Sequence, residues 1–159
     1  MTTLYVASPL GFSESGRAFH DGRLLPLIRD SGYDVLDPWA LSAAKVAAVH
    51  ALSDIGKRRD AWLALSAEIG ATNRTAIDRC DGLVAVLDGS DVDSGTAAEI
   101  GYAFARGKRV LGYRGDARSA GDNDAVVVNL QVDYFIRASG GDIVREVSAI
   151  PAALRRLFG

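Results

Sequence analysis

The sequence predicts an α/β fold in which helices flank a parallel β-sheet. Short apolar runs alternate along the chain with segments of helical periodicity, which is the pattern of successive βαβ units. The clearest unit spans residues 81–109, where an apolar strand over 83–87 leads into a polar loop and then into a helix that opens at Ser94. A chain of 159 residues has the size of one domain with its own core, so we expect a single domain over residues 1–159.

The other elements follow from apolar runs and from the residues that interrupt them. We expect strands at 4–8, 33–36, 83–87, 109–113 and 143–144, and helices at 17–30, 59–79, from 94 onward, around 132–136 and at 151–158. Pro26 is expected to kink or break the first helix, because proline lacks the backbone N–H that a helix interior needs. The alanine-rich stretch 40–57 has no clear period, and we expect it to be irregular.

Composition excludes several classes of protein. Hydrophobic residues make up 48% of the chain and the formal net charge is −2, which favours a folded protein over a disordered one. No basic cluster dominates, which argues against a nucleic-acid polymer as partner. No apolar run approaches the ~20 residues that span a membrane, and no N-terminal segment predicts secretion. The lone Cys80 excludes an internal disulfide and fits a cytoplasmic protein, while His20 and His50 are too isolated to predict a metal site.

A carboxylate-rich loop follows the apolar strand of the unit described first. It holds Asp88, Asp91 and Asp93, and the helix behind it carries Glu99, which we expect in its first turn. Ligands of open α/β sheets bind just beyond the carboxyl ends of the strands, so this loop is where we expect chemistry. Two interpretations of Glu99 stay open. It is either a nucleophile that the helix N-terminus keeps ionised, or the second half of a capping box that begins at Thr96.

Other polar and aromatic residues each allow a structural and a functional interpretation. Asp93 either caps the helix or accepts a hydrogen bond from a substrate hydroxyl. Asn73 lies in the middle of a predicted helix, where a surface position is the simplest expectation. The polar stretch 13–17 either caps a helix, which we favour, or cradles a phosphate at a helix N-terminus. Trp39 and Trp62 belong either to the core or to a surface on which a base stacks.

Four segments of the chain together resemble the nucleoside 2-deoxyribosyltransferase family. They are LYVASPLGF at 4–12, NRTAIDRCDGLVAVLDG at 73–89, DVDSGTAAEIGYAFARGK at 91–108 and VVNLQVDYF at 127–135. The most specific part is D-S-G-T-A-x-E-I-G-x-A, with an apolar strand before it and G-K and a further strand after it. The resemblance implies a flavodoxin-like five-stranded parallel sheet with helices on both faces, no cofactor, and a role in nucleotide salvage.

The resemblance also implies a reaction and roles for individual residues. Family members transfer 2-deoxyribose from one nucleobase to another through a covalent glycosyl-enzyme, so nucleosides and free nucleobases are the expected partners. The family's nucleophile matches Glu99, its sugar-contacting acid matches Asp93, and the tyrosine that orients the nucleophile matches Tyr5. An asparagine that a neighbouring subunit supplies matches Asn129, which implies a homo-oligomer with shared active sites. A carboxylate that traps the sugar covalently leads to retention of configuration by double inversion.

Further substrate contacts are expected beside these residues. Ser8 ends the first strand, and Ser94 and Gly95 offer backbone N–H groups at the start of the helix that carries Glu99. Asn73 departs from the family pattern, which often has an aspartate there that contacts the base. Because an amide is neither a general acid nor a general base, this difference bears on how the leaving base is protonated.

Two other functions compete with base exchange. A related N-glycosidase would hydrolyse nucleosides or nucleoside 5′-monophosphates, because water can attack the same intermediate and only its exclusion separates hydrolase from transferase. A non-catalytic module that senses nucleotides could use the same fold, since fold alone does not set function. The combination of Glu99, Asp93 and Tyr5 favours an enzyme over a sensing module.

Overall fold

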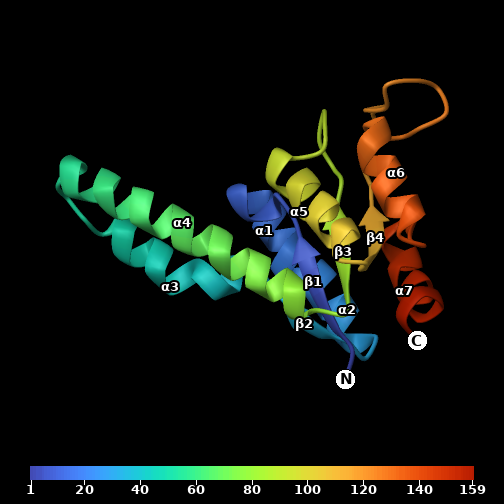
Figure 1. Ribbon diagram of the computed structural model, residues 1–159, viewed down its shortest axis with the longest axis horizontal. Helices are drawn as coiled ribbons and strands as arrows, with labels where there is room; N and C mark the ends of the chain where they lie inside the picture. Colours follow the sequence, from blue (N-terminus) through green and yellow to red (C-terminus); the bar gives the residue numbers. More distant parts are fainter.

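A five-stranded, all-parallel sheet forms the centre of the protein, as a computed structural model of residues 1–159 shows (Figure 1). The strand order is β2-β1-β3-β4-β5. The strands are β1 (Thr3–Ala7), β2 (Asp34–Leu36), β3 (Gly82–Val86), β4 (Arg109–Tyr113) and β5 (Asp142–Val144). This is the flavodoxin-like order, so the predicted fold class is confirmed. The direction in which successive strands are added reverses between β1 and β3, because β2 lies on one side of β1 and β3 on the other. Sheets of this type bind ligands at that switch point.

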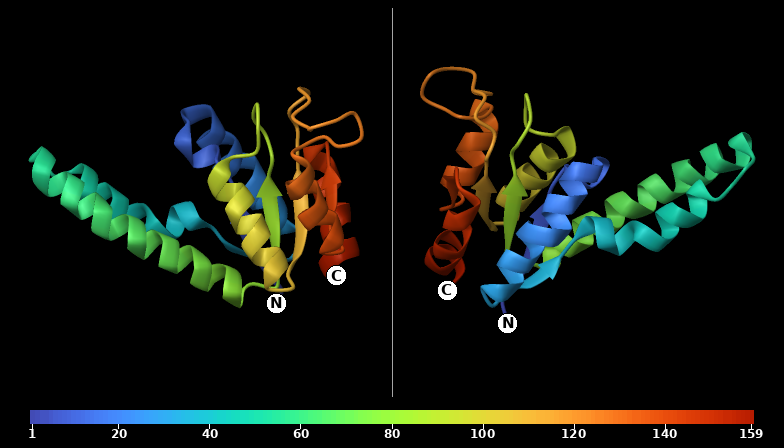
Figure 2. Two further views of the ribbon diagram at one scale, coloured as in Figure 1. Left: turned by 45° about the horizontal axis from the view of Figure 1, so that its top comes forward. Right: turned by 180° about the vertical axis from the view of Figure 1, so that it is seen from behind.

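Helices cover both faces of the sheet (Figures 1 and 2). One face packs against α1 (Glu14–Phe19), α2 (Leu25–Asp30) and α7 (Ile150–Phe158). The other face packs against the C-terminal end of α4 (Ile55–Arg79), against α5 (Ser94–Ala105) and against α6 (Leu130–Ala138). The chain also contains two short helical turns, η1 (Leu10–Phe12) and η3 (Val147–Ala149). No helix is long and apolar enough to cross a membrane.

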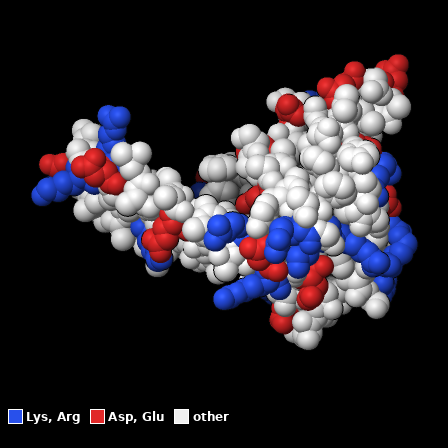
Figure 3. All heavy atoms as spheres, in the orientation of Figure 1, with Lys and Arg blue, Asp and Glu red and all other residues white.

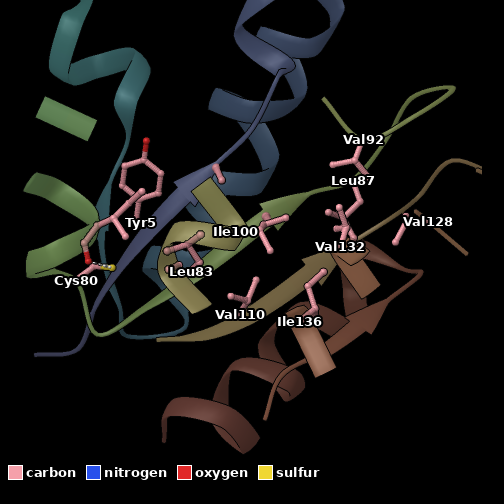
Figure 4. Packing of buried hydrophobic residues seen from close by; sticks show 14 of the residues in the cluster. Tyr5, Cys80, Leu83, Leu87, Val92, Ile100, Val110, Val128, Val132 and Ile136 are labelled. Atoms are coloured by element: carbon pink, nitrogen blue, oxygen red, sulfur yellow. Dashed lines mark hydrogen bonds between the residues drawn. The ribbon is translucent and has the colours of Figure 1, made fainter. Parts of the chain in front are cut away.

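The alternation of side chains along β1 divides the core into two clusters. Leu4 and Val6 point to the face of α1, α2 and α7, whereas Tyr5 and Ala7 point to the face of α4, α5 and α6. Tyr5 is fully buried and belongs to the second cluster, together with Leu83 of β3 (Figure 4). Full burial of an aliphatic side chain contributes roughly 1.5–3 kcal/mol, so this cluster fixes how β1 lies beneath α5.

A π-helical turn, η2 (His20–Leu24), joins α1 to α2 in the region where one helix with a kink at Pro26 is predicted. The N–H of Leu25 donates to the carbonyl of His20, five residues earlier. This wide turn ends directly before Pro26, whose ring and missing N–H do not fit an ordinary α-helical turn. The proline therefore alters the helix without ending it, and the turn places His20 inside the protein, 1% exposed.

The alanine-rich stretch 40–57, predicted to be irregular, is helical over most of its length. It contains most of α3 (Pro38–His50) and the first residues of α4. Asp37 caps α3 by accepting hydrogen bonds from the N–H groups of Trp39 and Ala40, and alanine has the highest helix propensity. The apolar period is weak because α3 packs mainly against α4, and only its first residues reach β1. The two helices form a hairpin that projects from the body (Figures 1 and 2), which we call the arm.

Candidate active site

Tyr5 and Glu99 meet on the face of the sheet that α4, α5 and α6 cover. The Tyr5 hydroxyl donates a hydrogen bond of 2.6 Å to Oε1 of Glu99. Tyr5 comes from the middle of β1 and Glu99 from α5, which follows β3. Because β1 and β3 are adjacent and α5 crosses both, the fold places a residue of α5 above the tyrosine ring. The structure thus brings together the two residues that the family resemblance links.

Asn73 of α4 contacts the same carboxylate oxygen. Its Nδ2 donates to Oε1 of Glu99 over 3.3 Å, while Oε2 of Glu99 has no hydrogen-bond partner in the chain. Oδ1 of Asn73 is buried and has no partner either. The surface position considered for Asn73 is wrong, because the side chain is half-buried and in contact with Glu99. The site therefore has two unused oxygens, one on each of these side chains.

Glu99 does not form the capping box. Helix α5 begins at Ser94, and Asp93 is its cap, with Oδ2 accepting from the N–H of Thr96 at 2.9 Å and from its hydroxyl at 3.2 Å. Glu99 consequently lies in the second turn of the helix rather than the first, and both of these expectations are wrong. In a capping box, the residue three positions after the cap reaches back to it. Because the cap lies three residues before Thr96, that residue is Thr96 itself and not Glu99. Glu99 is left free to face Tyr5.

Asp93 contributes to the site as well as to the helix. Only its Oδ2 is used in capping, and its charge is near enough to raise the pKa of Glu99. The backbone N–H groups of Ser94 and Gly95 are the first of α5 and have no hydrogen-bond acceptor in the chain. The start of α5 thus combines one free carboxylate oxygen with two free backbone donors.

Burial governs the ionisation of the two central side chains. Desolvation is the main reason that the pKa of Glu99 is raised above its ordinary value, and the charge of Asp93 adds to it. The hydrogen bonds from Tyr5 and Asn73 act in the opposite direction, because they stabilise the carboxylate. Desolvation, and then the nearby charge of Glu99, raise the pKa of Tyr5 well above its ordinary range. Tyr5 therefore keeps its proton and acts as a donor to the carboxylate.

Ser8 and Trp39 contact each other just beyond the ends of β1 and β2. The Oγ of Ser8 accepts from the N–H of Leu10 at 3.1 Å, and the Ser8 carbonyl accepts from Nε1 of Trp39 at 3.0 Å. The indole lies directly on Gly11, where a Cβ would come within 2.2 Å of the ring. Phe12, which is 75% exposed, contacts the same indole edge to face, with ring centroids 4.7 Å apart. Trp39 thus has a structural role, and Phe12 is an exposed aromatic ring that packs on it.

His20 and Asp37 form a buried pair that sequence reasoning missed. Nε2 of His20 lies 3.2 Å from Oδ1 of Asp37, and Nδ1 of His20 is buried without a partner. The pair and the two backbone N–H groups that Asp37 caps lower the pKa of this carboxyl group against the effect of burial. The charge of Asp37 also raises the pKa of Tyr5, so the pair of His20 and Asp37 lies near the site. The Asp-Pro sequence at 37–38 is a helix-start signal that could have indicated the cap, but not the histidine.

The polar stretch 13–17 caps a helix, as favoured. The Oγ of Ser13 accepts from the N–H of Gly16 at 3.0 Å, and the Arg17 guanidinium donates to the Gly11 carbonyl at 3.1 Å. Both side chains are therefore engaged within the loop. Cys80 is buried in the core, and no group of three or more His, Cys, Asp or Glu side chains is placed to hold a metal ion.

Asn129 lies apart from these residues in the chain. It caps α6, with its side-chain oxygen accepting from the N–H groups of Gln131 and Val132, and its Nδ2 lies 3.5 Å from Oδ1 of Asp122. No hydrogen bond joins Asn129 to the Glu99 cluster. The structure therefore does not bring Asn129 into the site of its own chain.

The loop that carries Asp93 is held by the loop that follows β4. The buried Arg114 guanidinium donates to the carbonyls of Leu87 and Gly89. Oδ1 of Asp88 accepts from the N–H of Asp116 at 2.9 Å, so Asp88 has a structural role in this turn. Gly89 has a φ of +134°, a conformation that other residues rarely adopt. These contacts fix the start of α5 relative to the sheet.

Comparisons with known proteins place the chain in a family. The sequence model described as nucleoside 2-deoxyribosyltransferase matches residues 4–135. Uncharacterized protein C191.05c of Schizosaccharomyces pombe is 42% identical, over 52% of this chain and 58% of its own length, so the chain spans little more than half of that relative.

Two solved structures share the fold. The 2-desoxiribosyltransferase from Leishmania mexicana has a TM-score of 0.67 at 22% identity over 100% of both chains. The CMP N-glycosidase BcmB of Clostridium botulinum has a TM-score of 0.56 at 16% identity, over 97% of this chain and 99% of its own. These likenesses agree with the sequence match, which covers most of the chain. The protein is therefore a member of the nucleoside 2-deoxyribosyltransferase family.

Proposed function

We propose that the protein transfers 2-deoxyribose between nucleobases, with Glu99 as the nucleophile. The observation that carries the proposal is the state of its carboxylate. Tyr5 and Asn73 both bind Oε1, which leaves Oε2 without a partner. Asp93, whose charge raises the pKa of Glu99, begins α5 beyond the carboxyl end of β3, and α/β sheets bind ligands there. A carboxylate held in this way has a fixed orientation and one oxygen available for attack.

The reaction proceeds in two displacements. Oε2 of Glu99 attacks the anomeric carbon, the glycosidic C–N bond breaks, and its electron pair leaves with the base, which takes up a proton. A nitrogen of the second base then attacks the same carbon from the face that the first base left. The C–O bond to Glu99 breaks, the carboxylate is restored, and the new base loses a proton. Two inversions retain the configuration of the sugar, and no cofactor takes part.

The neighbouring side chains orient the substrate. Tyr5 acts as a positioning residue, because its raised pKa keeps it a hydrogen-bond donor to Oε1. Asp93 binds a sugar hydroxyl through Oδ1, the oxygen that does not cap α5. Ser8 and the N–H groups of Ser94 and Gly95 complete the contacts to the substrate.

Asn73 contacts the base through its buried, unpartnered Oδ1. Glu99 can only accept a hydrogen bond while it is ionised, so the amide presents Nδ2 to it and Oδ1 to the ligand. An oxygen acceptor favours a base with an amino or ring N–H group at that position. Asn73 supplies no proton, so the proton for the leaving base comes from Asp93 or from a water molecule.

The active unit is a homo-oligomer in which Asn129 completes the site of a neighbouring subunit. Support comes from its position, since Asn129 contacts the loop at Asp122 and no residue of its own Glu99 cluster. Nucleosides and free nucleobases are the partners of this assembly.

Hydrolysis is the second candidate function. It is favoured by the structural likeness to a CMP N-glycosidase, in which the bond broken is also N-glycosidic. A phosphate cradle at residues 13–17 is not favoured, because Ser13 and Arg17 are engaged within their own loop.

One experiment separates these functions. The protein is incubated with a 2′-deoxynucleoside, with and without a free acceptor base, and the products are separated by chromatography. A new deoxynucleoside supports transfer, free base alone supports hydrolysis, and no change supports a sensing module. Glu99→Gln is the matched control, because it keeps the shape of the side chain and loses the charge. If it retains turnover within about tenfold of the parent, which is ~1.4 kcal/mol of barrier, Glu99 is not the nucleophile.

A further inference from the structure

Arg114, which directly follows β4, is a buried charge that the proposed reaction does not use. Its side chain is 0% exposed and forms no ion pair. An arginine stays charged in a protein, and a buried charge without an ionic partner destabilises the fold. The charges exposed beyond the carboxyl ends of the strands, at the top of Figure 3, are mostly acidic, whereas this guanidinium lies beneath the surface. Its position therefore needs an explanation other than solvation.

The guanidinium binds main-chain carbonyls of two different loops. Its Nη1 donates to the carbonyl of Leu87, and its Nη2 donates to the carbonyls of Gly89 at 3.1 Å and Arg118 at 2.8 Å. Leu87 and Gly89 begin the loop after β3, and Arg118 belongs to the loop after β4. Nε is buried without a partner. The fork of Nη1 and Nη2 therefore makes all the hydrogen bonds of this side chain.

The Arg114 side chain continues the pairing of β3 and β4 beyond the point where the two strands separate. The last main-chain bond between them runs from the N–H of Leu87 to the carbonyl of Tyr113, at 2.8 Å. In a longer parallel ladder, the carbonyl of Leu87 would accept from a main-chain N–H of the neighbouring strand. The guanidinium takes that place and also binds the carbonyl of Gly89, two residues further on. The start of the loop after β3 is thus held in line with the sheet.

Gly89 is held at both of its main-chain polar groups. Its carbonyl accepts from Arg114, and its N–H donates to Oδ2 of Asp116 at 3.3 Å. The loop is also tight, because a Cβ on Gly89 would lie 2.7 Å from the carbonyl oxygen of Asp91. Asp93 follows Gly89 by four residues. In a segment this short and closely packed, a displacement of Gly89 reaches Asp93.

We propose that Arg114 is a positioning residue that acts through the loop at Gly89 to hold Asp93 where its Oδ1 binds a sugar hydroxyl. The inference rests on the proposed function, in which Asp93 makes this contact, and adds a residue that touches neither the substrate nor Glu99. The hydrogen bonds and charges that act on the pKa of Glu99 come from other residues. An effect of Arg114 on the reaction must therefore pass through the loop.

A double-mutant cycle with Asp93 tests this role. Arg114→Lys keeps the buried charge but loses the fork that spans two carbonyls, and Asp93→Ser keeps a helix cap but loses the second carboxylate oxygen. Each single variant is expected to lower kcat/KM for a 2′-deoxynucleoside by about tenfold, the effect of one lost hydrogen bond to a charged group. The double variant is expected to fall no further than Asp93→Ser alone, because no sugar contact is left to position. Additive losses would overturn the proposal.

The pH–rate profile gives a second measurement that a purely structural role would not change. The charge of Asp93 raises the pKa of Glu99. If the loop carries Asp93 away from Glu99 in Arg114→Lys, the pKa of Glu99 falls, and the acid limb is expected to move to lower pH, as it does in Asp93→Ser. An acid limb that moves in Asp93→Ser but not in Arg114→Lys would show that the loop stays in place and would overturn the proposal.

Arg109→Lys is the matched control. Arg109 also donates to a main-chain carbonyl, that of Leu157 at 2.6 Å, but it lies at the opposite end of β4. This variant is expected to keep the parental kcat/KM and pH–rate profile, and an equal loss of kcat/KM here would overturn the proposal.

Circular dichroism checks that each variant is folded. If Arg114→Lys does not fold, Arg114→Met enters the same cycle, because it removes the buried charge together with its desolvation cost. If neither variant folds, Arg114 serves the fold alone and the proposal is wrong. An inactive parent would overturn the proposed function and this inference with it, whereas an active parent with additive losses overturns only the role of Arg114.

Discussion

The hydroxyl of Tyr5 and Oε1 of Glu99 are joined by a hydrogen bond of 2.6 Å between residues 94 positions apart in the chain. The bond runs from the middle of a strand that is buried over four of its five residues to the second turn of a helix. It lowers the pKa of a carboxyl group that burial raises. The ionisation of Glu99 thus depends on a donor that is itself part of the core.

Removal of this donor is expected to change the pH dependence of the reaction. In Tyr5→Phe the carboxylate loses a stabilising bond, so the pKa of Glu99 rises further and the acid limb of the pH–rate profile moves to higher pH. A hydrogen bond to a charged group contributes roughly 1.5–3 kcal/mol and one pKa unit is about 1.4 kcal/mol, so the shift is expected to be about one to two units. Tyr113→Phe is the control, because Tyr113 lies in the other core cluster. An unchanged acid limb in Tyr5→Phe would show that Tyr5 does not control the nucleophile.

Glu99 is expected to reduce the stability of the fold at neutral pH. Its folded-state pKa is raised above the ordinary 4.5, so the native state holds this proton to a higher pH than the unfolded chain. The associated stability is complete below the unfolded value and is lost as pH rises through the folded pKa. Glu99→Gln cannot ionise. The free energy of unfolding of this variant, measured with denaturant across this range, is expected to increase relative to that of the parent as pH rises. If the free energy of unfolding of the parent instead increased relative to that of Glu99→Gln as pH rises, the raised pKa would be contradicted.

Substitutions of Asn73 are expected to act on base preference and on pH dependence. Asn73→Asp places a second carboxylate against Oε1 of Glu99, which raises the pKa of the pair and moves the acid limb to higher pH. Asn73→Ala is expected to weaken discrimination between bases more than it lowers the melting temperature. Thr72→Ala is the control, as a neighbouring helix residue that does not contact Glu99. Parental rates, base preference and pH profile in both variants of Asn73 would remove it from the site.

Shared active sites predict complementation between two inactive variants. Asn129 also caps α6, and loss of such a cap costs about 1 kcal/mol, so Asn129→Ser is the sharper change. Serine keeps the cap and removes the amide. When Glu99→Ala and Asn129→Ser proteins exchange subunits, some sites receive an intact set of residues, and part of the activity is expected to return. Exchange is followed separately with labelled subunits. Full exchange without recovery would mean that Asn129 serves no neighbouring site.

The strands could be predicted from the sequence because each is a short apolar run that polar or glycine residues end. All five are found within a residue or two of their expected positions. Helix α3 could not, because it packs mainly against α4 and its many alanines leave no period to detect. Its helical state follows from propensity and from the cap at Asp37, which are local signals.

The site was predictable only in part. The carboxylate loop and Glu99 could be found from the strand–loop–helix pattern, but Tyr5 was tied to Glu99 by the family resemblance and not by spacing. The sequence could not decide between the two interpretations of Glu99, because Asp93, Ser94 and Thr96 are all residues that could cap the helix. The position of the cap in the structure decides between them. The pair of His20 and Asp37 depends on a π-helical turn that turns the histidine inward, and no local pattern predicts that turn.

Tyr5 shares one buried core cluster with Leu83 and Ile100, and its hydroxyl donates to the carboxylate of Glu99. Any change in these hydrophobic neighbours that shifts β1 against α5 also alters the separation of the two oxygens, and with it the acidity of Glu99. Core mutations remote from solvent are therefore able to retune the working pH of the protein without touching a polar residue. Evolution can adjust the chemistry of this family member through the packing of its interior.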